Sequence, residues 1–354
     1  SSAASDVYKR QAMSHANVYI NGQKVGYWPY GYNSFHFDIT KYLKPGEKNT
    51  LAVRLENLPE SSRWYPGAGL YRNVHLIVTE DAYIPVWGTY ITTPSVNEKF
   101  AKVNVLTKVV LPEGADPAKY SVETSVWNPN KQKLTAVRTS LAQMKYNNDQ
   151  AEQEFVIQDP FLWSPEMPAL YSAETRLYEG DKLKDVYTTP FGIRSIEIIP
   201  DKGFFLNGKR TVFKGVCNHH DLGPLGTAVN DAAIRRQIRI LKDMGCNAIR
   251  TSHNMPAPEL IRACDEMGMM IMAESFDEWN VAKCKNGYNL LFDEWAEKDL
   301  VNLLHNFRNN PSVVMWCIGN EVPNQWNEGD TKIAKWLQDI CHREDTSRMV
   351  TSAC

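Results

Sequence analysis

The sequence of 354 residues contains no apolar run that approaches about 18 residues, the length at which a transmembrane helix would be predicted. Its formal net charge of -2 gives no electrostatic reason to expect a nucleic acid or an anionic membrane as a partner. No GxGxxG or GxxxxGK(S/T) motif follows a predicted strand, which removes the main sequence reason to expect nucleotide binding. Any function must therefore be sought in other motifs.

Cysteine is absent before residue 217, and no CxxC pair or cysteine–histidine cluster occurs anywhere in the chain. The spacing therefore does not predict a zinc site. The cysteines lie mostly within apolar runs, where buried free thiols are common, and they mildly favour a reducing compartment. Their positions are 217, 246, 264, 284, 317, 341 and 354. The sequence does not otherwise identify a compartment.

The length predicts two or three domains, and 43% hydrophobic with 23% charged residues is typical of a globular protein with substantial cores. Residues 1–11 show neither a strand nor a helix pattern, and we interpret them as a non-native leader. Residues 349–354 stop inside a predicted strand. We therefore expect the chain to be truncated at both ends.

The first two predicted domains are all-β. Residues 12–82 are expected to form part of a β-sandwich, because Asn21-Gly22 separates two strand-like segments and further strands are predicted at 34–39, 50–55 and 72–78. Residues 83–198 are expected to form an immunoglobulin-like β-sandwich, since short strands alternate with Pro, Gly, Asn and Asp. Its predicted strands are 101–111, 120–127, 134–141, 152–157 and 171–177.

Residues 199–354 alternate strands with helices, which predicts a parallel sheet. Asn230 and Asp231 begin a helix with an apolar face formed by Ile234, Ile238, Leu241 and Met244. Further helices are expected at 258–267, 295–307 and 332–342, and strands at 211–217, 247–251, 269–273 and 312–319, with a fifth beginning at 349. Two closures fit this pattern: an open doubly wound sheet, or strands one to four and the start of strand five of a (β/α)8 TIM barrel.

Each of the first four predicted strands ends in polar residues, which favours the barrel because barrel enzymes carry their chemistry at these ends. The residues are Asn218, His219, His220 and Asp221; Ser252, His253 and Asn254; Glu274, Asp277, Glu278 and Trp279; and Asn320 with Glu321. His and Asn side chains suit hydroxyl groups, and an aromatic ring suits the apolar face of a sugar. Glycoside cleavage also needs a protonated carboxyl group, which desolvation at the end of a buried strand would favour for Glu321.

Four stretches taken together resemble glycoside hydrolase family 2: residues 62–72, 214–226, 249–253 and 316–323. The resemblance runs from about residue 16 to the last residue. It implies a sugar-binding-type sandwich, an immunoglobulin-like sandwich and a TIM barrel in that order. It also implies a retaining β-glycosidase that acts by double displacement, with Glu321 as the acid/base.

The resemblance implies roles for neighbouring residues. Asn320 matches a residue that hydrogen-bonds the sugar 2-hydroxyl, and His219 and His253 match substrate-contacting histidines. Three further residues are candidates for the substrate site: His220, which could exchange roles with His219; Glu274, which would support the site or else pair with an arginine such as Arg250; and Trp279, as an aromatic facing the sugar. Residues 63–72 resemble a loop that packs toward the barrel, and we expect its role to be structural.

No cofactor is required by the expected mechanism. Some family members bind a divalent cation with the acid/base and a third-strand carboxylate, here Glu278, but Asn280 stands where a histidine is expected. The expected partner is a β-linked oligosaccharide or glycoside, and the whole protein could form a homo-oligomer.

The family's nucleophile lies at the end of the seventh strand, and none of Glu266, Glu294, Glu297 and Glu328 matches it, so no nucleophile is assigned. We therefore expect the isolated chain to hydrolyse no aryl glycoside. The motif at 217–226 favours a β-galactosidase, with a β-glucuronidase as the nearest alternative and a β-mannosidase less favoured. A non-catalytic carbohydrate-binding or scaffold protein remains an alternative from another class.

Overall fold

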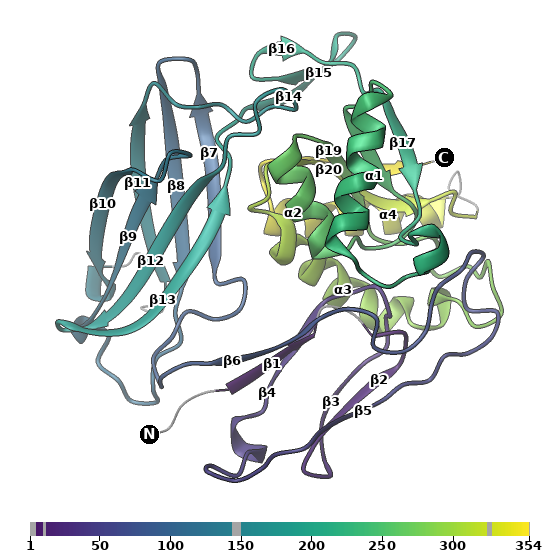
Figure 1. The fold of residues 1–354 in the computed structure, drawn as a ribbon, viewed down its shortest axis with the longest axis horizontal. Helices are drawn as coiled ribbons and strands as arrows, with labels where there is room; N and C mark the ends of the chain where they lie inside the picture. The colour runs from purple at the N-terminus through teal and green to yellow at the C-terminus, as the bar shows by residue number, and fades with distance from the viewer. Residues whose placement is uncertain (1–4, 10–11, 144–149, 324–327, 354) are drawn as a thin grey trace.

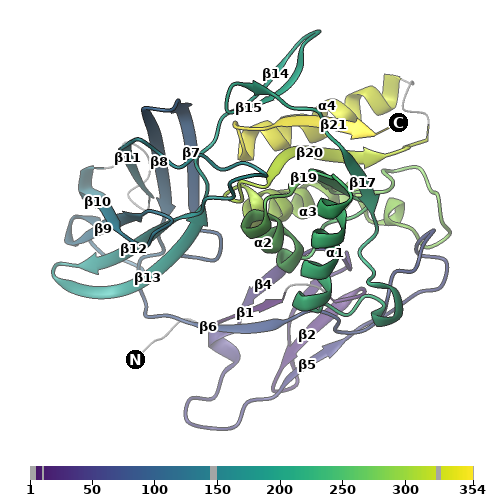
Figure 2. The same cartoon turned by 45° about the horizontal axis from the view of Figure 1, so that its top comes forward.

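The computed structural model describes residues 5–9, 12–143, 150–323 and 328–353, and Figure 1 shows them as three parts. A long sandwich stands on one side, an α/β part beside it, and a smaller β part below both (Figures 1 and 2). No described helix is long and apolar enough to cross a membrane.

The first part contains strands that pair in two sheets. One sheet has the order β4-β1-β6, and the other has the order β3-β2-β5. The bounds are β1 Ser5–Lys9, β2 Ala16–Ile20, β3 Gln23–Trp28, β4 Phe35–Asp38, β5 Leu51–Arg54 and β6 Val74–Val78. The predicted hairpin is confirmed, with Asn21 and Gly22 at φ 51° and 81° between β2 and β3.

The prediction that residues 1–11 carry no strand was wrong. Strand β1 pairs antiparallel with both β4 and β6, for example Val7 with Phe37 and with Leu76. The local sequence has no alternation to reveal this strand. Its pairing is supplied by two neighbours that lie far along the chain, so only the tertiary structure shows it.

The second part is an antiparallel sandwich with sheets of order β11-β8-β7 and β10-β9-β12-β13. The bounds are β7 Thr89–Val96, β8 Phe100–Lys108, β9 Tyr120–Trp127, β10 Lys133–Ser140, β11 Gln150–Gln158, β12 Tyr171–Glu179 and β13 Lys182–Phe191. Every second residue of β8 is buried, which is the pattern of a strand with one face on the core. Each predicted strand of this region coincides with a strand of the structure, and β7 and β13 were missed.

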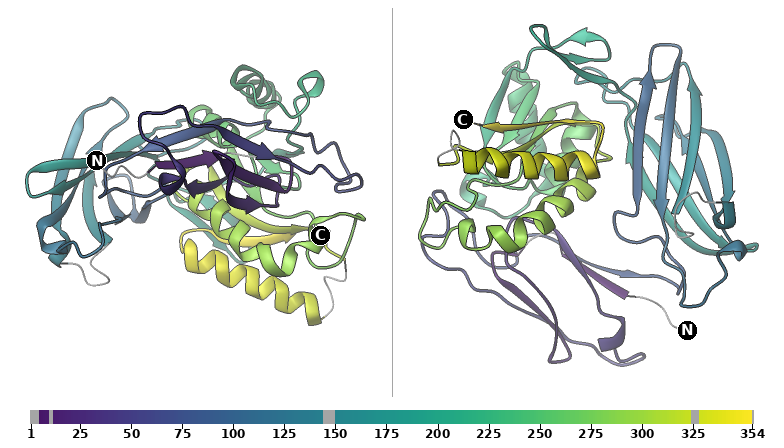
Figure 3. Two further views of the ribbon diagram at one scale, coloured as in Figure 1. Left: turned by 90° about the horizontal axis from the view of Figure 1, so that it is seen from below. Right: turned by 180° about the vertical axis from the view of Figure 1, so that it is seen from behind.

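The third part holds a parallel sheet of order β17-β18-β19-β20-β21 with an α-helix between each pair of successive strands. The bounds are β17 Gly215–Asn218, α1 Asp231–Asp243, β18 Ala248–Thr251, α2 Pro258–Met267, β19 Met270–Glu274, α3 Phe292–Phe307, β20 Val313–Asn320, α4 Glu328–Glu344 and β21 Met349–Ala353. Strands β14 Ile196–Ile199, β15 Gly203–Leu206 and β16 Lys209–Arg210 precede it. Figure 3 shows α4 lying against this sheet when the molecule is seen from behind.

The strand order decides between the two closures. Each strand pairs in parallel with the next one in sequence, without the reversal of order that a doubly wound sheet requires. Every residue of β20 is buried, as expected for a strand covered on both faces. The described strands therefore form part of a barrel rather than an open sheet.

The first barrel helix follows its predicted pattern with one correction. Asn230 caps α1 by accepting a hydrogen bond from the Ala233 amide, and Ile234, Ile238 and Leu241 are buried. Met244 was expected on the same face but is 68% exposed, because it lies beyond the last helical turn.

Short 3-10 helices occupy Thr40–Tyr42, Pro117–Lys119, Leu141–Gln143, Gly223–Leu225 and Tyr288–Leu290.

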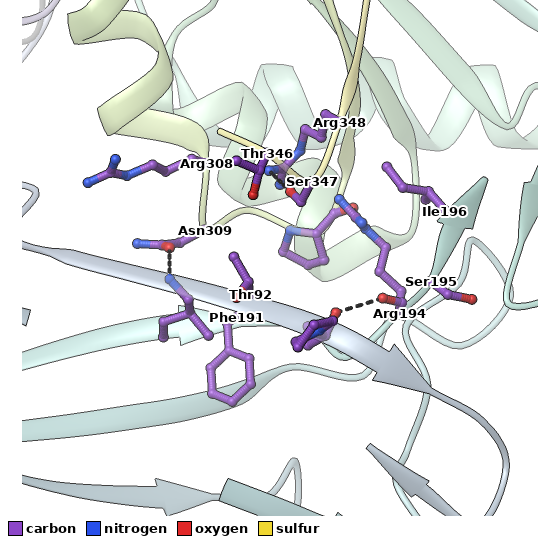
Figure 4. Close-up of a pocket in the computed structure, with 15 residues that line it drawn as sticks. Thr92, Phe191, Arg194, Ser195, Ile196, Arg308, Asn309, Thr346, Ser347 and Arg348 are labelled. Atoms are coloured by element: carbon purple, nitrogen blue, oxygen red, sulfur yellow. Dashed lines mark hydrogen bonds between the residues drawn. The ribbon is translucent and has the colours of Figure 1, made fainter. Parts of the chain in front are cut away.

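The sandwich contacts the barrel through a buried arginine. The Arg194 guanidinium donates to the carbonyls of Pro311 and Val313, both at 2.7 Å. Arg348 donates to the same Val313 carbonyl from the barrel side. A cavity of about 320 Å³ lies beside these groups, and Figure 4 shows Asn309, Arg194 and Arg348 around it. Asn309 accepts a hydrogen bond from the Ile91 amide. These contacts fasten the amino ends of the barrel strands to the sandwich.

Candidate active site

The carboxyl ends of four neighbouring strands bring the predicted site residues together. His219 follows β17, His253 follows β18, Glu274 ends β19, and Asn320 with Glu321 closes β20. Parallel strands present these ends at one edge of the sheet, so residues about a hundred positions apart in the sequence become neighbours.

Glu274 is the buried centre of this group. Its side chain is fully buried, and it forms an ion pair with Arg250 and a 2.9 Å hydrogen bond with His253 Nδ1. Arg250 also donates to Asn320 Oδ1 at 2.8 Å. The sequence left open whether Glu274 supports the site or pairs with Arg250. The structure shows the pair with Arg250, and the same two side chains also hydrogen-bond Asn320 and His253.

Glu321 lies at the rim of the site. Its backbone nitrogen donates to the Ala353 carbonyl at 2.9 Å, and its φ of 40° ends the extended run of β20. The side chain is 61% exposed, so the predicted burial of Glu321 was wrong. Burial stops at Asn320 because Glu321 is one residue beyond the strand.

A cation from the first part of the chain reaches Glu321. Arg63 Nη1 lies 4.0 Å from Glu321 Oε2, while Arg63 Nε and Nη2 donate to the two oxygens of Asp277 at 3.1 and 2.7 Å. Asp277 also accepts from Asn320 Nδ2 at 2.9 Å. Burial opposes ionisation of Asp277, but hydrogen bonds from Arg63 and Asn320 and the nearby Lys283 charge hold the pKa of that carboxyl below its usual value.

Trp64 supplies the aromatic wall of the site. Its ring centroid lies 5.0 Å from that of His219 and 5.7 Å from that of His253, and the two histidine rings lie 5.3 Å apart. Burial and the neighbouring His253 lower the pKa of His219, which favours its neutral form. The predicted residues His219 and His253 therefore form one surface with Trp64, which was not predicted.

The prediction that Trp279 faces a sugar was wrong. Trp279 is 3% exposed, and its Nε1 donates to the Ile318 carbonyl at 2.8 Å inside the barrel core. The sequence could not distinguish Trp279 from Trp64, since both are aromatic residues in loops. The 62–72 stretch could have indicated Arg63 and Trp64 as site residues, because it has no strand alternation and still carries large side chains.

The prediction that His220 could take the place of His219 was also wrong. Its ring packs 5.1 Å from the ring of Tyr32, and its Nε2 lies 3.2 Å from the Pro66 carbonyl. Burial and the nearby Arg72 charge lower the pKa of His220 to about 4. His220 thus packs against Tyr32 and Pro66, whereas the adjacent His219 lies with His253 and Trp64.

The weak metal candidate Glu278 does not fit a cation site in this structure. Its two carboxylate oxygens accept the backbone amides of Lys283 and Asn289, at 2.6 and 3.0 Å. Among the residues that the structure describes, no group of three or more His, Cys, Asp and Glu is placed to hold a metal ion. Glu278 therefore shapes the loop after β19.

Comparisons with known proteins agree with this arrangement. The family model described as "Glycosyl hydrolases family 2, TIM barrel domain" matches residues 197–353, and the model "Glycosyl hydrolases family 2" matches residues 83–194. Together the two matches span most of the chain. The chain belongs to glycoside hydrolase family 2.

Three similar proteins come from Bacteroides species. Beta-galactosidase BoGH2A of Bacteroides ovatus is 45% identical over 315 residues, which are 89% of this chain and 37% of that protein. A beta-glucuronidase of Bacteroides fragilis is 31% identical, over 96% of this chain and 50% of that protein. The crystal structure of a family 2 member from Bacteroides cellulosilyticus superposes with a TM-score of 0.95 at 34% identity, over 99% of this chain and 45% of that chain. The chain thus spans half or less of the length of these relatives.

Proposed function

We propose that the natural polypeptide containing this chain is a retaining β-glycosidase that hydrolyses terminal β-D-galactosides, with Glu321 as the acid/base. The observation that carries this proposal is the linked group at the carboxyl edge of the parallel sheet: Arg250 bonds Asn320, and Glu274 bonds His253. Trp64 packs on His253, and Glu321 directly follows Asn320, with Arg63 4.0 Å away. The edge offers a carboxyl group, amide and imidazole partners for hydroxyls, and an aromatic surface. Exposure of Glu321 leaves it accessible to a substrate.

The proposed reaction is a double displacement. In the first step a carboxylate nucleophile forms a bond to the anomeric carbon, the glycosidic C–O bond breaks, and Glu321 gives its proton to the departing oxygen. In the second step Glu321 takes a proton from water, whose oxygen replaces the nucleophile at the anomeric carbon. No nucleophile is assigned among the described carboxylates beside Glu321, where Asp277 pairs with Arg63 and Glu274 pairs with Arg250.

The other residues would bind and orient the sugar. Asn320 is buried, and its amide oxygen and nitrogen are bonded to Arg250 and Asp277, so in this proposal it fixes these two side chains beside Glu321. His219 and His253 would contact further hydroxyls, and Trp64 would lie against the apolar face of the ring. Glu274 acts through His253 rather than by touching the substrate.

Replacing Glu321 by glutamine tests the proposal. In the complete natural polypeptide, E321Q should lower kcat/KM for phenyl β-D-galactoside about a hundredfold or more, because glutamine cannot donate the proton. E294Q is the matched control, since Glu294 is 72% exposed on α3, where it pairs with Lys298; the activity of E294Q should be unchanged. A loss of only a fewfold in E321Q would favour the alternative of a carbohydrate-binding or scaffold protein.

β-Glucuronidase is the second candidate, and relatives bear both names. The proposal of a galactosidase draws on the Bacteroides ovatus β-galactosidase, which is 45% identical to this chain, whereas the Bacteroides fragilis β-glucuronidase is 31% identical. Kinetics of the complete polypeptide on 4-nitrophenyl β-D-galactoside and 4-nitrophenyl β-D-glucuronide would separate them. A higher kcat/KM for the galactoside is expected, and a higher value for the glucuronide would reverse the assignment.

The β7–β13 part is, in the same proposal, an immunoglobulin-like domain. Its support is the division of antiparallel strands into the sheets β11-β8-β7 and β10-β9-β12-β13, which face each other across a shared core. The site residues named above all lie outside the described residues of this domain.

A further inference from the structure

We propose that Arg63, which the first part of the chain contributes, is a positioning residue for the acid/base Glu321. This inference rests on the proposed function. It gives the 62–72 loop a part in proton transfer, beyond the structural role that its sequence suggests.

The contact geometry fixes the Arg63 guanidinium group. Nε and Nη2 donate to Oδ2 and Oδ1 of Asp277, a two-point pairing that sets the plane of the guanidinium as well as its position. The third nitrogen, Nη1, is then left 4.0 Å from Glu321 Oε2. Within the described residues, this is the ion pair that Glu321 forms.

The partner of Arg63 is itself anchored in the barrel. The Asp277 side chain is 13% exposed and accepts hydrogen bonds from Asn320 Nδ2 at 2.9 Å and Lys283 Nζ at 3.2 Å. Lys283 also donates to the Asn320 carbonyl at 2.5 Å. Arg63 is therefore held relative to the residue that directly precedes Glu321.

Other contacts hold the loop that carries Arg63. Asn286, in the barrel loop after β19, donates from its side chain to the Pro59 carbonyl at 2.7 Å and from its backbone to the Glu60 carbonyl at 3.0 Å. Trp64 packs against His219 and His253 on the other side of Arg63. A Cβ on Gly67 would come within 2.2 Å of Thr227 Oγ1, so the loop backbone lies directly on the barrel. The Arg63 guanidinium is thus carried by a loop that packs against the barrel.

The chemical consequence concerns the leaving group. Glu321 has few fixed contacts of its own, since its side chain is 61% exposed. Arg63 limits the positions that this carboxyl group can adopt and keeps it beside Asn320. Misplacement of an acid slows departure of a poor leaving group, which needs the proton, more than departure of a good one, which does not.

The test measures kcat/KM of the complete natural polypeptide for two substrates, phenyl and 4-nitrophenyl β-D-galactoside. If the enzyme hydrolyses glucuronides faster, the phenyl and 4-nitrophenyl β-D-glucuronides replace them. R63Q should lose at least about tenfold more activity on the phenyl than on the nitrophenyl substrate. R63K, which keeps the charge but not the two-point pairing, should fall between R63Q and the wild type. R54Q is the control, because Arg54 is an exposed arginine of the same part, paired with Glu56.

The possible results distinguish a failure of the Arg63 inference from a failure of the proposed function. Equal losses of R63Q on both substrates would show that Arg63 only holds the loop, and no loss would show that it is not needed; either result overturns the inference. Asp277→Asn offers a second variant that should reproduce the leaving-group dependence if R63Q fails to fold. E321Q serves as the reference: if it lacks a leaving-group dependence, the proposed function itself fails. If E321Q shows it and the folded Arg63 and Asp277 variants do not, only the Arg63 inference fails.

Discussion

Asp299 on α3 is a fully buried carboxylate that joins the first part of the chain to the barrel. Its Oδ1 accepts from Trp28 Nε1 at 2.8 Å and from Asn33 Nδ2 at 2.7 Å, and its Oδ2 accepts from Tyr288 OH at 2.5 Å. Burial raises the pKa of Asp299 to about 6, although these three donors oppose the shift.

This residue predicts a pH dependence of stability. Between the unfolded pKa near 4 and the folded pKa of about 6, the folded state holds the proton more tightly, so the free energy of unfolding falls as pH rises. The shift corresponds to an effect on the order of 3 kcal/mol. Asp299→Asn should remove this part of the slope. Urea unfolding of wild type and variant from pH 4 to 7 would measure it, and parallel pH profiles would contradict the assignment.

At the scale of elements, glycine ends the first two barrel helices in two different environments. Gly245 follows α1 at φ +88°, and a Cβ there would meet nothing within 4 Å. Gly268 follows α2 at φ +72°, and a Cβ there would lie 2.3 Å from the Pro165 carbonyl oxygen. Both have the left-handed backbone that favours glycine, but only Gly268 lies against a neighbouring segment.

The two glycines form a matched pair for mutation. G245A should destabilise by about 1 kcal/mol, the usual penalty for a left-handed alanine. G268A should destabilise by several kcal/mol more, because the backbone at Pro165 must move. Denaturant midpoints of the two variants would compare them directly. Equal losses of stability in the two variants would mean that the backbone at Pro165 moves away from Ala at position 268 at no measurable cost in free energy.

The elements were predicted more completely than the side-chain orientations. Alternation of apolar residues indicated β8, β9, β11 and β12, and the caps and apolar faces indicated α1 and α2. Strand β1 was missed because its stability comes from pairing with β4 and β6 rather than from its own pattern.

At the scale of the whole molecule, the parallel sheet ends in β17 and β21 within the described residues. We expect the isolated 354-residue chain to show no turnover of 4-nitrophenyl β-D-galactoside. Retaining hydrolysis needs a second carboxyl group about 5 Å from the acid, and no nucleophile is assigned among the described residues. The complete polypeptide, assayed in parallel, provides the positive control. Turnover by the isolated chain at a comparable rate would refute the expectation.

The sequence by itself determined the order of the parts, the parallel sheet and the polar strand ends, because these follow from local periodicity and from where a strand must stop. It also indicated Glu321, Asn320, His219, His253 and Glu274 as candidate site residues. The structure brings Asn320, His219, His253 and Glu274 together at one edge of the sheet, and Glu321 directly follows Asn320.

Only the tertiary structure decided which neighbours share the site. His219 and His220 are adjacent in sequence but contact different surfaces, and Trp64 rather than Trp279 lies beside the histidines. It also brought Arg63 to Glu321 across 258 positions of sequence. The physical reason is that orientation and long-range contact depend on how the first part of the chain packs on the barrel, and no local pattern of residue types encodes that packing.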